Sequence, residues 1–290
     1  EKTRVVGLHV EVAVDHDDAL RHVVERGAED RAVLLQFFRP LVDLGRPRVA
    51  TALSGLVGYL RRERPAVLFS AMYHANLVAI LAHGLARSSS RLVISERQSF
   101  VALRQAERSY KERLMRGAMR LLYPRADAVI TVSKALAAEI TDGLDLAAET
   151  IFPVYNPVVS AEMLALADQD PGHPWFEEDI PVVVAAGRLA PQKDFPVLLG
   201  AVALIARRRP IRLILVGEGQ SRADLEALAA RLNIADRVDL VGRKSNPWSF
   251  MKRGAVFALS SISEGMPSVL IEAIAVGARV VSTDCPTGPR

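Results

Sequence analysis

The chain has 290 residues, of which 50% are hydrophobic, and its formal net charge is +4. This length and composition allow two globular domains and exclude a disordered or low-complexity protein. The one cysteine, Cys285, excludes an internal disulfide, and no stretch approaches the roughly twenty apolar residues of a membrane span.

Strands and helices are predicted to alternate in the first half, as in a parallel sheet covered by helices. The predicted strands are 4–10, 32–37, 66–70, 91–95, 128–132 and 150–155. The predicted helices are 50–62, 76–86, 101–122 and 134–142. This pattern indicates an α/β domain at 1–157.

The predicted helix 101–122 is basic and amphipathic. Its basic residues are Arg104, Arg108, Lys111, Arg113, Arg116 and Arg120. Its apolar side carries Leu103, Tyr110, Leu114 and Leu121. Such a helix is suited to an anionic membrane surface, and a solvated basic face explains the pattern equally well.

A linker at 158–180, rich in turn-forming residues at 168–174, is predicted to separate the first domain from a second one at 181–290. The predicted strands of the second domain are 182–186, 212–216, 238–241, 255–259 and 279–282, with helices between them. The second domain is therefore also predicted to be α/β.

Two glutamates, Glu264 and Glu272, follow the predicted strand 255–259, at the start of a helix. The free amides of a first helical turn favour anions such as phosphate. Glu264 is placed to accept hydrogen bonds from sugar hydroxyls, and Glu272 from a second diol such as a ribose. The pattern suits a sugar nucleotide, and an acidic cap with a solvated glutamate is the plain alternative.

A second strand end carries positive charge. Arg188 and Lys193 follow the predicted strand 182–186, before a helix that begins at Phe195. Ligands of open α/β sheets bind beyond the carboxyl ends of strands, so both side chains are candidates for binding phosphate.

Gly187-Arg188-Leu189, Gln192-Lys193 and the two glutamates together resemble the retaining nucleotide-sugar glycosyltransferases of family 4, the glycosyl transferases group 1. The resemblance is strong over 181–286 and weaker over 66–156. It implies the GT-B fold, with two Rossmann-like parallel-sheet domains facing a cleft. Relatives extend further at both ends, so we expect this chain to be a fragment lacking both.

The resemblance also implies roles for individual residues. Arg188 and Lys193 would hold the donor diphosphate, Glu264 the transferred sugar and Glu272 the ribose. The other donor-binding residues that it implies are Gly187, Gly217, Glu218, Arg243, Gly265, Met266, Pro267, Ser268 and Val269. The turn at Gly217 is no dinucleotide fingerprint, because Arg222 replaces its third glycine.

The acceptor-side candidates His74, Glu96 and Arg97 follow two predicted strands of the first domain, and we expect them to face the cleft. Many relatives have a histidine near the end of the strand that finishes here with Glu96. His74 is a possible substitute, and a structural histidine is the simpler interpretation.

No metal and no cofactor are expected. Asp15-His16-Asp17-Asp18 contains an Asp-x-Asp pattern, but it precedes Ala19 and Leu20 like a helix cap. A second such pattern, Asp168-Gln169-Asp170, lies in the predicted linker. Arg188, Lys193 and a helix amino end would supply the positive charge instead.

The resemblance therefore predicts retaining transfer of a sugar from a nucleotide sugar, with UDP the expected nucleotide. The acceptor would be a saccharide or lipid-linked saccharide in cell-surface polysaccharide or glycolipid synthesis, and the protein cytoplasmic or peripheral on the inner membrane face. Nucleic acid is not an expected partner, because aromatic content is low and no recognition module is evident. A sugar-nucleotide epimerase of the same fold and a non-catalytic nucleotide-binding remnant remain alternatives.

Overall fold

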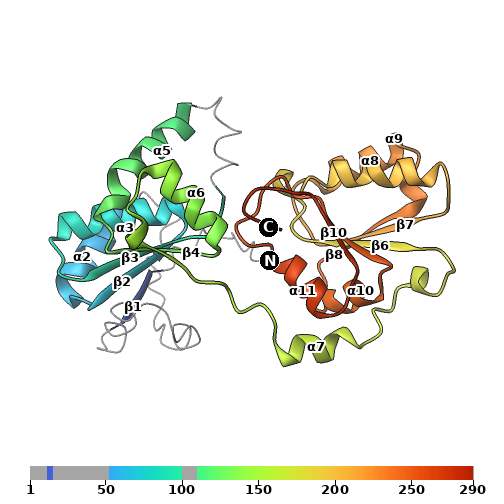
Figure 1. Ribbon diagram of the computed structural model, residues 1–290, viewed down its shortest axis with the longest axis horizontal. Helices are drawn as coiled ribbons and strands as arrows, with labels where there is room; N and C mark the ends of the chain where they lie inside the picture. The colour runs from blue at the N-terminus through green and yellow to red at the C-terminus, as the bar shows by residue number, and fades with distance from the viewer. Residues whose placement is uncertain (1–11, 16–51, 100–109, 290) are drawn as a thin grey trace, which may run out of the picture. The chain divides into compact units, whose positions relative to one another are not determined.

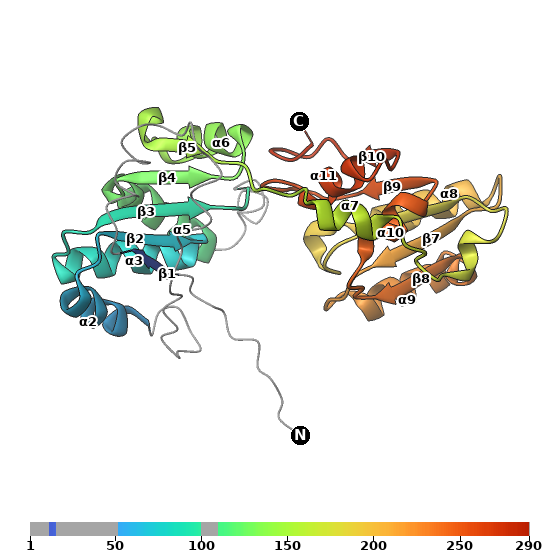
Figure 2. The ribbon, with the colours of Figure 1, turned by 90° about the horizontal axis from the view of Figure 1, so that it is seen from below.

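The computed structural model describes residues 12–15, 52–99 and 110–289 (Figures 1 and 2). The chain divides into a first unit, Glu1–Tyr155, and a second unit, Asn156–Arg290. The predicted strands 4–10 and 32–37 lie outside the described residues, as do Leu103, Arg104 and Arg108.

The first unit contains a five-stranded sheet whose strands follow one another in chain order. They are β1 (Val12–Asp15), β2 (Val67–Ala71), β3 (Arg91–Glu96), β4 (Ala128–Thr131) and β5 (Ile151–Pro153). The last four are parallel and confirm the predicted strands within two residues at each end. β1 was not predicted: it pairs antiparallel with β2 and ends at Asp15. The residues that follow in the predicted helix cap, 16–20, lie outside the described residues.

Helices lie on one side of this sheet (Figure 1). They are α2 (Leu53–Glu63), α3 (Tyr73–Ala86), α5 (Tyr110–Leu122) and α6 (Lys134–Leu144). Because α3 begins three residues before the predicted start, His74 belongs to its first turn. In the described part of the chain, no helix is both long and apolar enough to cross a membrane.

The second unit contains a parallel sheet with the strand order β10-β9-β6-β7-β8. The strands are β6 (Val182–Ala186), β7 (Arg212–Val216), β8 (Val238–Gly242), β9 (Val256–Leu259) and β10 (Val280–Ser282). All five were predicted within one residue at each end. The chain leaves β6 towards β7 and β8 and returns on its other side as β9, so β6 and β9 flank the point where the strand order reverses.

Helices cover both faces of the second sheet (Figures 1 and 2). α8 (Phe195–Ala206) and α9 (Arg222–Arg231) pack on one face with Leu213 and Leu215 of β7, and Ile214 faces the other core. That other face carries α7 (Ala161–Ala167), α10 (Pro247–Arg253) and α11 (Ser268–Ala275). Burial on both faces explains why these strands are continuous apolar runs instead of alternating ones.

The range 158–180, expected to be a linker, contributes to the core of the second unit. α7 lies within it, and the side chain of Met163 is only 2% exposed. His173 Nε2 lies 3.1 Å from Asp239 Oδ2, which fixes the segment after α7 to β8. The turn-forming composition at 168–174 correctly indicated a loop. The helix before it was missed because seven residues are too short for a clear periodic signal.

Candidate active site

The loops after β6 and β9 are joined by hydrogen bonds at the reversal point of the second sheet. The backbone N–H of Ile262 donates to the carbonyl of Gln192 at 2.9 Å, and Gln192 Nε2 donates to the carbonyl of Ser263 at 2.8 Å. Ser260 Oγ donates to the carbonyl of Lys193 at 2.7 Å. The topology therefore brings together two motifs that lie about seventy residues apart in the sequence, at the edge where such sheets bind ligands.

Lys193 and Glu264 form an ion pair at this edge. Lys193 Nζ lies 2.6 Å from Glu264 Oε1, with side-chain exposures of 16% and 9%. Ser261 Oγ donates to the same carboxylate oxygen at 2.6 Å, and Thr287 Oγ1 donates to the carbonyl of Glu264. Charge-assisted hydrogen bonds of this kind hold both charged groups in one geometry before any ligand arrives.

Arg188 differs from Lys193 in having no ion-pair partner in the described part of the chain. Its side chain is exposed, and among the described residues it makes no ion pair or hydrogen bond. Its backbone is fixed by its neighbour Leu189, whose N–H donates to the carbonyl of Glu218 at 2.9 Å. The guanidinium is therefore available to bind an oxyanion in a bidentate way.

Gly187 and Gly217 allow the loops after β6 and β7 to touch through their backbones. Both have a backbone φ of +150°, a conformation that residues other than glycine rarely adopt. A Cβ on Gly217 would lie 1.9 Å from the carbonyl oxygen of Gly187, which is a severe steric clash. One on Gly187 would meet the side chain of Lys193 at 3.1 Å. The backbone contact between the two loops therefore requires glycine at 217, and a Cβ at 187 would displace the side chain of Lys193 by a few tenths of an ångström.

Gly217→Ala is expected to destabilise the second unit by at least about 2 kcal/mol, because it adds backbone strain to a direct clash. Trp175 and Trp248 are the two tryptophans of the chain and lie in this unit, so fluorescence-detected urea unfolding measures the effect. The control is Gly200→Ala in α8, where a Cβ meets nothing within 4 Å and alanine favours the helix. Equal stability of Gly217→Ala and the unchanged protein would contradict the prediction.

Glu272 is held by a residue that the sequence analysis did not identify. The indole Nε1 of Trp248, on α10, donates to Glu272 Oε2 at 2.9 Å. The other carboxylate oxygen has no partner among the described residues, so it is available to a ligand. α11 begins at Ser268 with Pro267 as its N-cap, and its amino end follows the loop that carries Glu264.

The remaining predicted donor-binding residues differ in burial and in hydrogen-bond partners. Glu218 Oε1 lies 2.8 Å from Arg222 Nη1, and Arg222 Nη2 donates to the carbonyl of Leu240 at 2.8 Å. Arg222, which disrupts the dinucleotide fingerprint, thus ties the loop after β7 to β8. Gly265 is buried, Met266 and Val269 are half-buried, and Arg243 is exposed with no partner in the described part.

The first unit holds the acceptor-side candidates. His74 is exposed, its ring centroid lies 3.7 Å from that of Tyr73, and partial burial lowers its pKa. Arg97 is exposed and has no partner among the described residues. Glu96, by contrast, is 2% exposed. Its side chain is enclosed in the first unit by contacts with Asn76 of α3 and Tyr123, contrary to the expectation that it faces an open cleft.

Glu96 belongs to a buried polar cluster with Asn76 and Tyr123. The Tyr123 hydroxyl donates to Glu96 Oε1, and Asn76 Nδ2 donates to the same oxygen at 2.8 Å. Burial raises the pKa of Glu96 to about 7, although both hydrogen bonds act to lower it. Asn76 Oδ1 has no hydrogen-bond partner in the described structure. Burial therefore favours the neutral carboxyl group of Glu96, whereas the hydrogen bonds from Tyr123 and Asn76 favour its carboxylate form.

The second Asp-x-Asp pattern has structural partners. Asp168 forms an ion pair with Lys252, and Asp170 Oδ1 accepts a hydrogen bond from the N–H of Gly172 at 2.9 Å. Across the described ranges, no three His, Cys, Asp or Glu side chains lie close enough to hold a metal ion.

Comparison with known families agrees with these motifs. The sequence model described as Glycosyltransferase Family 4 matches residues 6–162, more than half of the chain. The chain belongs to this family. The model described as Glycosyl transferases group 1 matches residues 169–290, which contain the donor-side candidate residues, so this family 4 chain matches the second family model as well.

Two curated relatives of the family 4 chain come from bacteria. The N-acetylgalactosamine-N,N'-diacetylbacillosaminyl-diphospho-undecaprenol 4-alpha-N-acetylgalactosaminyltransferase of Campylobacter jejuni is 27% identical over 222 residues, which cover 74% of this chain and 56% of that protein. The amylovoran biosynthesis glycosyltransferase AmsD of Erwinia amylovora is 25% identical over 252 residues, which cover 86% of this chain and 68% of that protein.

A solved structure supports the fold. The crystal structure of Anabaena Alr3699/HepE in complex with UDP and glucose matches with a TM-score of 0.63 at 21% identity, covering 82% of this chain and 64% of that one. This similarity confirms the predicted GT-B type of α/β fold with two Rossmann-like units. The family 4 chain spans between half and about two thirds of the length of these three proteins.

Proposed function

We propose that the second unit binds a UDP-linked sugar at the edge formed by β6 and β9, and that the whole protein transfers the sugar with retained anomeric configuration. The observation that carries this proposal is the largely buried ion pair of Glu264 with Lys193, which lies on the same loop after β6 as Arg188, a side chain without a partner among the described residues. UDP is the nucleotide chosen because the Anabaena structure is a complex with UDP and glucose.

In the proposed reaction, the bond between the anomeric carbon and the diphosphate oxygen breaks, and the diphosphate departs with the electron pair. The acceptor hydroxyl attacks the same face of the sugar, and its proton passes to an oxygen of the departing phosphate. Negative charge grows on the leaving group, where Arg188 and Lys193 stabilise it. Glu264, already fixed by Lys193 and Ser261, orients the sugar hydroxyls.

The reaction is proposed to need no metal ion. Two cationic side chains and the amino end of α11 supply positive charge to the diphosphate, which is the task of a metal in other nucleotide-sugar sites. Turnover that is unchanged by a chelator would support this part of the proposal.

The acceptor is proposed to be a saccharide or a lipid-linked saccharide at the cytoplasmic face of a membrane. The name of the Campylobacter relative specifies a diphospho-undecaprenol acceptor, and that of the Erwinia relative specifies amylovoran biosynthesis. On α5, Leu114 is 62% and Leu121 is 68% exposed, and Arg113 is exposed beside them. This helix is therefore a candidate membrane contact of the first unit.

Calorimetric titration with UDP, GDP and ADP in the presence of a chelator tests the donor site. UDP is expected to bind, and Glu272→Ala is expected to weaken binding about tenfold or more, because a hydrogen bond to a charged group contributes about 1.5–3 kcal/mol. Glu162→Ala, at an exposed glutamate of α7, is the matched control. Binding of no nucleotide, or equal binding by Glu272→Ala, would overturn the proposal.

A further inference from the structure

Helix α8 has an unusual composition for a surface helix. Its twelve residues include no charged and no polar side chain. Leu198, Leu199 and Val202 are buried against the sheet, whereas Val197 is 56% and Leu204 is 61% exposed. Surface helices normally carry polar residues on their outer side, so this apolar stripe is unpartnered in the described structure.

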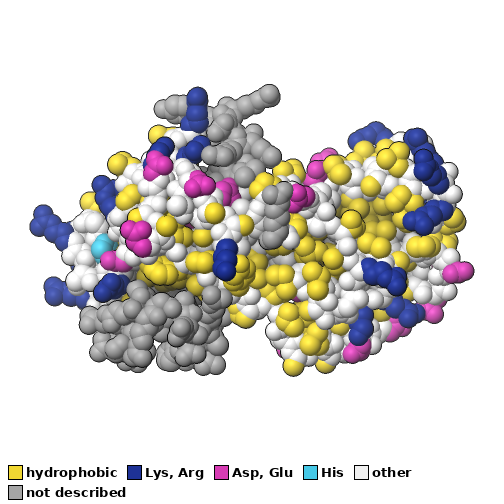
Figure 3. All heavy atoms as spheres, in the orientation of Figure 1, with side chains coloured by type: hydrophobic (Ala, Val, Ile, Leu, Met, Phe, Trp, Pro, Cys, Tyr) yellow, Lys and Arg dark blue, Asp and Glu magenta, His cyan; other side chains and the backbone are white. Residues whose placement is uncertain are grey.

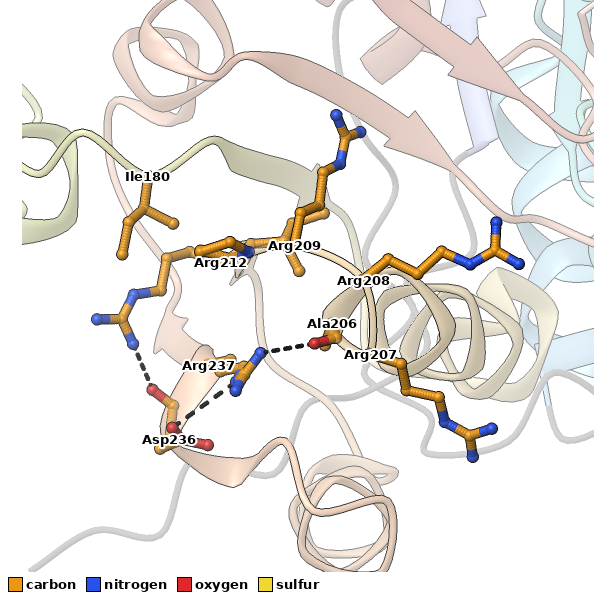
Figure 4. A pocket seen from close by; sticks show the side chains of 10 residues that line it. Ile180, Ala206, Arg207, Arg208, Arg209, Arg212, Asp236 and Arg237 are labelled. Carbon is orange, nitrogen blue, oxygen red and sulfur yellow. Dashed lines mark hydrogen bonds and ion pairs between the residues drawn. The ribbon is translucent and has the colours of Figure 1, made fainter.

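Three arginines follow α8 directly. Arg207, Arg208 and Arg209 are exposed, and within the described residues they have no ion pair and no side-chain hydrogen bond. They line a hollow that also contains Arg212 and Arg237, shown in Figure 4.

The other two arginines of the hollow are held by the fold. Arg212 Nη1 donates to the carbonyl of Asp236 at 2.7 Å, and its guanidinium lies 4.7 Å from the ring of Trp175. Arg237 Nη1 donates to the carbonyl of Ala206 at 3.2 Å. They leave Arg207, Arg208 and Arg209 as the charges available to a partner.

The direction of the three free side chains indicates the kind of partner. In Figure 4 the side chains of Arg207, Arg208 and Arg209 point away from one another. They do not converge on one point, as a site for a single phosphate group would require. A fan of arginines instead suits an anionic surface that extends over many phosphates.

The hollow and the candidate active site lie at opposite ends of the parallel strands of the second sheet. Ile180, Arg212 and Arg237 precede or begin β6, β7 and β8, at the amino ends of these parallel strands. Arg188 and Glu264 follow the carboxyl ends. Figure 3 shows hydrophobic side chains gathered over the part of the second unit that contains α8, with basic side chains at its outer margin. The arginine hollow is therefore distinct from the donor site.

We propose that Val197, Leu204, Arg207, Arg208 and Arg209, the α8 surface, bind an anionic lipid bilayer. The apolar side chains enter the boundary between head groups and acyl chains, and the arginines contact lipid phosphates. Apolar and basic groups side by side are complementary to a bilayer, whereas a soluble polyanion would use only the arginines. The proposal does not rest on the proposed transfer activity.

Sedimentation with vesicles tests the α8 surface. The unchanged protein is expected to bind vesicles containing about a third phosphatidylglycerol more tightly than neutral phosphatidylcholine vesicles. Arg208→Glu and Leu204→Ser are each expected to weaken that binding about fivefold or more, from the contributions of one basic charge and one inserted apolar side chain. The matched control Arg231→Glu, at an exposed arginine of α9, is expected to bind as the unchanged protein does.

Three outcomes would overturn the proposal. The first is unchanged binding by Arg208→Glu, with all loss confined to Arg113→Glu on α5. The second is unchanged binding by Leu204→Ser together with competition by inositol hexakisphosphate, which would indicate a polyanion site. The third is failure of the unchanged protein to bind anionic vesicles. Unfolding curves of each variant keep a folding defect separate from a loss of binding, because both substituted side chains are exposed.

Discussion

Arg188→Ala is expected to lower the turnover of sugar transfer about hundredfold or more, while the free energy of unfolding stays within about 0.5 kcal/mol of the unchanged protein. The large kinetic effect follows from the loss of one preorganised charge at the leaving diphosphate. The small thermodynamic effect follows because Arg188 is exposed and makes no hydrogen bond or ion pair with the described residues. Turnover with the donor at saturation, measured beside urea unfolding, separates the two quantities.

Lys193→Ala removes the other cation of the site, and it is expected to lower both turnover and stability. Turnover should again fall about hundredfold, but the free energy of unfolding should also fall by about 3 kcal/mol, because Glu264 is left as a buried carboxylate without its positively charged partner. Unchanged turnover in Arg188→Ala would contradict the proposed site. Equal stability losses in both variants would contradict the distinction between a free and a paired cation.

The second unit could be predicted well because burial on both faces leaves a strong signal. Strands such as β6 and β7 are uninterrupted apolar runs bounded by glycine, arginine or proline, and they occur at the predicted residues. Placing Arg188 and Glu264 beyond the carboxyl ends of β6 and β9 required only the rule that ligands of such sheets bind there. The resemblance of their motifs to a known family also supplied the expected roles of these residues.

Individual contacts in the site could not be predicted in the same way. The contact of Lys193 with Glu264 joins residues 71 positions apart, and the contact of Trp248 with Glu272 joins two helices. Such pairs depend on loop conformation and helix orientation, which composition and periodicity do not determine. Ser261 could have been suspected from its place just after β9, whereas nothing in the sequence distinguished Trp248 from a core aromatic.

The site residues of the first unit were harder to predict from the sequence, because some of its polar side chains are buried. Glu96 looked like a surface carboxylate at a strand end, and only the positions of Asn76 and Tyr123 show that it is enclosed. Tyr123 lies 27 residues further along the chain, in the turn after α5, so no local pattern links the two. A buried carboxyl group with few partners then has a measurable consequence for stability.

Glu96→Gln is expected to remove a pH dependence from the stability of the first unit. The pKa of Glu96 is about 7 in the folded protein, against 4.5 for an unperturbed glutamate, because burial disfavours the charged form. Between these values the folded state holds a proton that the unfolded state has lost, so the free energy of unfolding falls as pH rises. The total loss from pH 4.5 to about 7 is about 3 kcal/mol.

Glutamine keeps an oxygen that can accept from Tyr123 and Asn76 and carries no charge at any pH. Glu96→Gln should therefore match the unchanged protein near pH 5 and exceed its stability at pH 8 by about 3 kcal/mol. Circular dichroism follows the urea unfolding of both units, whereas tryptophan fluorescence follows the second unit alone, so a change in circular dichroism without a change in fluorescence measures the first unit. Glu149→Gln, at an exposed glutamate, should leave the pH dependence intact. Parallel pH profiles for Glu96→Gln and the unchanged protein would show that Glu96 is already ionised in the folded state.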